Sequence, residues 1–351
     1  MRVVAGRRGA GRTRRRSAPL FAAVLVLVTL ARLEVSGAAF TATTADSGND
    51  WAATSLQPAS DLSAAQVCTN DPVPALRASS TSSAVADGLI TISRPAGVVA
   101  GDVMLAALGS AGTPDLATIV PPSGWTLLDA ASSSITQAVY LHRATASEPA
   151  DYTWTYPTPG VVGGIVAYSG VHPKFPVNAH ASLVNPNQNL VSAPSVTTTT
   201  TNTRLVGFFA LGSPGSWTPP SGTVEHWDIR DGSMSQASAS EPLTEAGSTG
   251  TRSATSSVGG RGVGTVVALA PSATPSASLT WTASPSTITT GYRLDRLVAG
   301  AVQATTTVTG RTTTTAADGP LVNDTAYTYS LRATLSSWRS PSTTTTLTPD
   351  C

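Results

Sequence analysis

Four histidines, His142, His172, His180 and His226, are the side chains of this sequence best suited to acid–base chemistry or metal binding. His172 and His180 flank the segment PKFPVNA, a spacing compatible with a metal pair, but no cysteine or carboxylate cluster accompanies them. His142 lies in YLHRA, whose alternation is typical of a strand face. The sequence therefore predicts no metal site.

The sequence carries no local signature of a catalytic site. It has no HExxH, no Gly-rich phosphate loop and no GxSxG elbow. Asp228 and Asp231 in HWDIRDG are too few hard ligands for a calcium loop. Glu148 and Glu241 both belong to a repeated ASEP, which favours a turn role over paired carboxylates for glycoside hydrolysis. We therefore predict no catalytic residue, no cofactor and no enzyme activity, with a secreted hydrolase as the third-ranked hypothesis.

Tryptophans give a better indication of binding, because exposed indoles stack on sugar rings or anchor protein partners. Trp125 and Trp154 lie in alternating segments, where core positions are expected, and Trp227 lies in VEHWDI. Trp217, in SPGSWTPPSG, lies in an expected loop. We therefore predict that Trp217 is exposed and is the candidate ligand-stacking residue.

The first 39 residues have the pattern of a secretory leader, and the rest of the chain follows them. Residues 1–39 combine an arginine-rich stretch, the apolar run LFAAVLVLVTLA and a small-residue SGAA, which predicts a secretory signal peptide. A bilayer span needs about twenty apolar residues, so a retained membrane anchor is the alternative. From residue 40 onward, 13 basic and 19 acidic residues give a formal charge of −6, which argues against nucleic-acid binding.

Cys68 and Cys351 are the two cysteines of the chain. In an exported protein two cysteines usually form one disulfide. Two free thiols and intermolecular bridges are the alternatives at this stage.

Residues 277–348 resemble a fibronectin type III domain. Trp281 stands where that family has its buried strand-B tryptophan, GYRLDR matches strand C, and LVNDTAYTYSLRA matches the run leading through strand F. The resemblance implies a seven-stranded sandwich in which the Tyr327 hydroxyl is bonded to upstream backbone. It implies no particular function.

Strand A of such a domain is missing directly upstream of residue 274. Residues 56–68, LQPASDLSAAQVC, have the family's strand-A pattern, so we expect residues 69–273 to be inserted between strands A and B and residues 274–351 to complete the domain. This topology would bring Cys68 and Cys351 to one pole, within the 7 Å or so that a disulfide allows between Cα atoms. The alternative is that residues 56–68 are linker and the domain is truncated.

The inserted segment repeats itself. LAALGS, PPSG, ASEP and GGIVAYSG each return, in the same order, about 93–103 residues later as FALGS, PPSG, ASEP and GTVVALAP. Two related halves packed face to face predict a jelly-roll-like β-sandwich, with two separate sandwiches as the alternative. Residues 100–271 also resemble a β-sandwich module of exported bacterial and phage surface proteins, which implies an extracellular, non-catalytic role.

The expected fold class is therefore all-β: a fibronectin type III-like sandwich interrupted by a larger jelly-roll-like sandwich. Residues 40–55 form an extended segment that resembles the start of camelysin-like, SipW-processed surface proteins. We predict a secreted or cell-surface binding or adhesion module for a glycan or a cell-surface protein. A structural subunit of a surface layer, fibre or matrix is the alternative. Membrane contact is expected only through the signal segment, if it is not cleaved.

Overall fold

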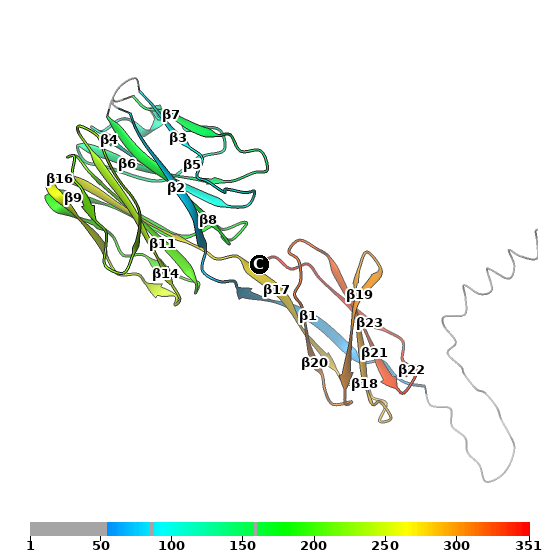
Figure 1. The fold of residues 1–351 in the computed structure, drawn as a ribbon. Coiled ribbons are helices and arrows are strands. Elements are labelled where there is room, and N and C mark those ends of the chain that lie inside the picture. Colours follow the sequence, from blue (N-terminus) through cyan, green and yellow to red (C-terminus); the bar gives the residue numbers. More distant parts are fainter. Residues whose placement is uncertain (1–54, 85–87, 158–159) are drawn as a thin grey trace, which may run out of the picture.

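The protein is described from a computed structural model that covers residues 55–84, 88–157 and 160–351. The predicted signal peptide and residues 40–54 lie outside these ranges. Figure 1 shows two lobes, each built from strands. In the described ranges no helix has the length and apolar character that a membrane crossing requires. The all-β prediction is confirmed.

The smaller lobe is a sandwich of two antiparallel sheets. One sheet has the order β1 (Ser60–Asn70), β17 (Ala273–Thr282), β20 (Thr315–Asp318). The other has the order β19 (Ala301–Thr309), β18 (Gly291–Val298), β21 (Tyr327–Leu335), and both β22 (Trp338–Arg339) and β23 (Thr343–Leu347) pair with β21. This is the strand order of a fibronectin type III domain.

Two side chains expected of that fold occupy their predicted places. Trp281 is buried and packs edge-on against Tyr292, with ring centroids 5.4 Å apart. The backbone N–H of Val322 donates to the hydroxyl of Tyr327 over 2.9 Å, which is the predicted tyrosine corner.

β1 lies beside β17 although about two hundred residues separate them. The pairing is antiparallel and runs from Ser60 opposite Thr282 to Asn70 opposite Ala273. β1 starts four residues later than expected, yet Leu56 is already buried in the core of this lobe. The chain leaves this sheet after Asn70 and returns to it at Ala273, and the larger lobe lies between those two points (Figure 1).

The first half of the larger lobe has a five-stranded and a two-stranded sheet. The larger sheet has the order β2 (Ala75–Ala84), β8 (Val161–Ser169), β4 (Val103–Ala111), β6 (Ile135–Arg143), β5 (Thr126–Ser132). β3 (Leu89–Ser93) pairs with β7 (Asp151–Thr155), and a single 3₁₀ turn, η1 (Leu116–Thr118), follows β4. The first strand of this half, β2, pairs with its last strand, β8, and β8 in turn pairs with the third strand, β4, as in a jelly roll.

The second half repeats this order. Its larger sheet runs β9 (Val177–Ala193), β16 (Arg252–Leu269), β11 (Thr203–Leu211), β14 (Ser235–Leu243), β13 (Val224–Arg230), with β12 (Trp217–Thr218) also on β16. β10 (Thr197–Thr198) pairs with β15 (Gly247–Ser248). The repeated sequence segments therefore correspond to a repeated topology.

The two halves pack through their larger sheets. One apolar cluster joins side chains of β4 and β8 to side chains of β11 and β16, and the central strands are buried on both faces. At the centre of this interface, Gln236 Nε2 donates to Gln137 Oε1 over 3.2 Å, and Gln137 Nε2 donates to Thr265 Oγ1 over 2.8 Å. Each half is thus a two-sheet unit in itself, and the halves meet face to face.

Candidate functional site

The prediction that Trp217 is exposed is wrong. Its side chain is only 7% exposed and packs against Phe209. Residue 217 belongs to β12, which pairs with the outer part of β16, and its backbone N–H donates to Asp228 Oδ2 over 2.9 Å. The Pro- and Gly-rich surroundings indicated a loop, but this loop folds back onto the sheet. Trp217 therefore cannot stack on a ligand.

The other three tryptophans of the larger lobe are also buried. Trp125 and Trp154 occupy the core position predicted for them, together with Tyr140 and Tyr152. Trp227 lies in the interface between the two large sheets. No tryptophan of the larger lobe is available for binding at the surface.

His142 and Glu148 form a buried polar network beneath Trp125. His142 Nδ1 lies 2.8 Å from the Gly124 carbonyl oxygen, and its Nε2 lies 3.0 Å from Glu148 Oε2. Both ring nitrogens of His142 are therefore held by polar partners. Burial works to raise the pKa of Glu148, but hydrogen bonds from Thr145, Tyr152 and His142 outweigh it and lower that pKa to about 2. Glu148 thus fixes the turn after β6, as predicted. The same prediction is wrong for Glu241, which lies within β14 opposite Leu205.

His226 lies in a second polar group, at the interface of the two halves. Its Nε2 is 3.0 Å from the Tyr168 hydroxyl and 2.9 Å from the Ser240 hydroxyl. Burial, with a smaller effect of Arg204, lowers the pKa of His226 to about 4. The geometry of Ser240 and His226 is that of a nucleophile and its base, but Ser240 is buried between the sheets. The group is therefore part of the core.

The lowered pKa of His226 predicts acid sensitivity of the larger lobe. Its unfolded pKa is near 6.5, so the folded protein resists a proton that the unfolded chain accepts below that pH. The resulting stability is complete above about pH 6.5 and falls by about 2–3 kcal/mol by about pH 4.5. Chemical denaturation at several pH values between these limits measures the loss.

The control is His226→Gln, which keeps a polar side chain but cannot be protonated. This variant is expected to lose much less stability over the same window. The Glu148 contribution is lost mainly below pH 4.5, the ordinary pKa of that carboxyl, so it does not obscure the result. An equal loss in both proteins would show that another group carries the acid sensitivity.

His172 and His180 do not form a metal pair. His172 Nδ1 accepts the backbone N–H of Phe175 over 3.0 Å, whereas His180 Nδ1 lies 2.9 Å from Asp129 Oδ2 on β5. Across the described ranges, no three His, Cys, Asp or Glu side chains gather closely enough to hold a metal ion.

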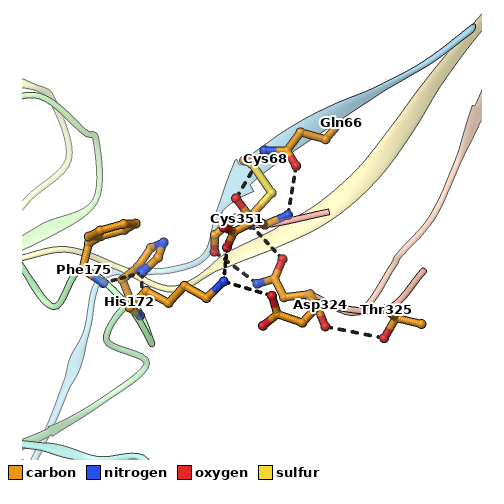
Figure 2. A network of polar contacts seen from close by, with 10 residues as sticks. Gln66, Cys68, His172, Phe175, Asp324, Thr325 and Cys351 are labelled. Carbon is orange, nitrogen blue, oxygen red and sulfur yellow. Dashed lines mark hydrogen bonds and ion pairs between the residues drawn. A yellow bond between two sulfur atoms is a disulfide. The ribbon is translucent and has the colours of Figure 1, made fainter. Parts of the chain in front are cut away.

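The junction between the lobes is a dense polar site, drawn in Figure 2. Cys68 and Cys351 form the predicted disulfide, with their Cα atoms 5.6 Å apart. The side-chain amide of Asn323 bonds both backbone groups of Cys351, over 2.8 and 3.1 Å. Lys174, from the connection between β8 and β9, forms ion pairs with Asp324 and Asp350 of the smaller lobe. The disulfide therefore closes the smaller lobe, and the ion pairs of Lys174 join the larger lobe to it beside that bond.

The opposite pole of the smaller lobe presents the exposed tryptophan that the sequence analysis did not select. Trp338 is 62% exposed and follows a two-residue turn in which Ser336 has a positive φ of 51°. Its cross-strand partner is Leu335. Two further connections reach this pole, because Thr290 bonds both the Thr334 carbonyl and the Gly310 N–H. Trp338 is thus an exposed indole on a two-residue hairpin, at the pole of the smaller lobe that lies away from the disulfide.

A small hollow lies over the outer face of the second large sheet. Thr223 and Ala239 line it. Thr223 follows PPSG as Trp125 does in the first half, and Ala239 lies opposite Gly207 as Tyr140 lies opposite Ala106. The hollow therefore corresponds to the space that aromatic rings fill in the first half.

Comparison with known proteins gives little further information. No protein-family profile matches the chain, and no curated protein matches it. Among the solved structures that match is the crystal structure of chicken CNTN1 FN1–FN3 domains, at 11% identity and a TM-score of 0.19 over 79% of this chain and 97% of that chain. At this TM-score the similarity says nothing about how the domains of this chain are arranged. Its fibronectin type III-like sandwich is identified by its own strand order and tyrosine corner.

Proposed function

We propose that the protein is an exported, non-enzymatic binding or adhesion module of the cell surface or extracellular space, and that Trp338 contacts its partner. The observation that carries this proposal is the exposed indole of Trp338 on a tight hairpin, at the pole of the smaller lobe opposite the junction. An indole face stacks on sugar rings and anchors protein partners at low entropic cost. Arg339, also exposed, adds hydrogen-bond donors beside it.

Export is supported by two features. The leader-like residues 1–39 precede the domain, and the disulfide is a bond that persists in oxidising compartments. The resemblance of residues 100–271 to surface-protein modules supports the same location. In this proposal the ion pairs of Lys174 orient the larger lobe relative to the smaller lobe that carries Trp338.

A glycan array and a cell-binding assay with the disulfide-bonded protein test the proposal. Trp338→Ala is expected to weaken binding about thirtyfold or more, as truncation of a central aromatic contact does. Val322→Ser is the matched control, because Val322 is equally exposed but lies at the pole of the disulfide. Blank assays with the unaltered protein, or equal binding by Trp338→Ala, would refute the proposal.

A further inference from the structure

β19 is an edge strand with one flank unoccupied in the described structure. It pairs with β18 alone, through eight residue pairs between Gly291–Val298 and Ala301–Thr309. The opposite edge of the same sheet, β23, has five residues and is tied to the segment before β1, because the Thr343 hydroxyl donates to the Ala59 carbonyl. The β19 edge is therefore longer than the β23 edge, and β23 is bonded to a neighbouring segment.

The sequence of β19, AVQATTTVT, lacks the devices that usually protect an edge. Edge strands of monomeric proteins carry charged residues, proline or a disruptive bulge, because unpaired backbone groups recruit other strands. β19 has no charged residue and no proline. Its one irregularity is near its start, between the pairs of Arg296 and Leu297, so residues 304–309 are regularly paired.

Other edges of this protein do carry such protection. β13 contains Glu225, Asp228 and Arg230 and has a register shift between Glu225 and Trp227. β9 contains Pro186 and three register shifts. β19 is therefore distinguished from these two edges by composition and by regularity.

We propose that β19 is the edge at which a second copy of this chain adds, in an antiparallel and two-fold symmetric pairing. Paired with itself in any antiparallel register, the strand places no charge opposite another charge. Thr opposite Thr or Val is a favourable cross-strand pair. The nearest charges behind the edge are already neutralised, because Arg293 Nε is bonded to both carboxylate oxygens of Asp295 at 2.8 and 2.9 Å. Such an isologous contact joins two five-stranded sheets into one.

The contact is expected to be weak. One pair of nine-residue strands buries less than the roughly 1,000 Å² of a stable interface, so the expected Kd is on the order of 0.1–1 mM. Association of this strength matters where many copies are held close together, as in a surface layer or matrix. It adds self-association to the proposed binding function and does not depend on Trp338.

Sedimentation equilibrium of the disulfide-intact protein, taken to concentrations above the expected Kd, tests the proposal. Thr307→Lys places a charge at an exposed position of β19 and is expected to weaken self-association at least about tenfold, since a two-fold pairing centred on residues 304–309 brings the two introduced charges close together. Thr344→Lys introduces the same charge at an exposed position of β23 and is expected to leave association unchanged. Circular dichroism establishes that all variants are folded.

Charge reversal and hydrogen exchange complete the test. Thr307→Glu alone should also associate weakly, and an equimolar mixture of Thr307→Lys and Thr307→Glu should regain the association. In the unaltered protein, amide protection in residues 304–309 should rise with concentration. A strictly monomeric unaltered protein would overturn the proposal, as would a Thr307→Lys that associates normally or a Thr344→Lys that is equally impaired.

Discussion

Trp125→Ala is expected to lower the free energy of unfolding of the larger lobe by about 3–5 kcal/mol. The indole lies 5.1 Å from the ring centres of both Tyr152 and Trp154 and stacks on His142 at 5.2 Å. Its removal leaves a cavity among side chains that are held by strands on two sides. It also uncovers the buried hydrogen bonds between His142 and Glu148.

The second half of the lobe supplies the matched control. Thr223 stands in the equivalent place after PPSG and lines the hollow, so Thr223→Ala removes little packing and is expected to cost about 1 kcal/mol or less. Denaturant unfolding followed by circular dichroism compares the two variants without relying on tryptophan emission. Similar costs for both would show that the aromatic cluster is not a principal part of the core.

The internal repeat in the sequence corresponds to a repeated strand order, because two of its four repeated segments are buried strands. GGIVAYSG and GTVVALAP form equivalent parts of β8 and β16, whereas LAALGS lies within β4 and FALGS begins in the equivalent strand β11 and runs past its end. The echo SITQA and SMSQA also contains Gln137 and Gln236. No sequence pattern indicates that two equivalent glutamines meet inside an interface, because that contact depends on how the halves are oriented.

The strands that alternation did not reveal are the exposed ones. β2 and β9 are rich in Ser, Thr or Asn, and β9 contains Pro186 within NPNQN, a pattern typical of a turn. An edge strand tolerates these residues, because one side of it makes no ladder hydrogen bonds and its bulges absorb the proline. Their polar composition therefore reflects position in the sheet.

The prediction that Trp217 is exposed was wrong because local sequence does not report where a segment lies relative to the sheet. Proline and glycine around Trp217 indicate a break in regular structure, but they do not say whether the break faces solvent or the sheet. Trp338 follows Ser336 and Ser337 in SSWR, a weak turn signal, and only the two-residue hairpin shows that its side chain points outward. The candidate contact residue thus came from the geometry of the smaller lobe.

Replacing both Cys68 and Cys351 by serine is expected to destabilise the smaller lobe by about 2–4 kcal/mol and to leave the larger lobe unchanged. The disulfide spans 283 residues, so it closes a very long loop when the whole chain is unfolded. The larger lobe shortens that loop while it stays folded, because Asp71 N–H donates to the Ser272 carbonyl over 2.8 Å and holds its two ends together. The expected cost is therefore lower than chain length alone would give.

Hydrogen exchange resolves the effect by lobe. In the double variant, amides of β17, β18 and β21 should exchange faster, while those of β4, β6 and β8 should keep their rates. The contacts of Asn323 with residue 351 and of Lys174 with Asp350 do not need the sulfurs, so the junction should still form in the native state. If both lobes lost protection equally, they would unfold as one cooperative unit, and the disulfide would stabilise the whole described chain through the junction.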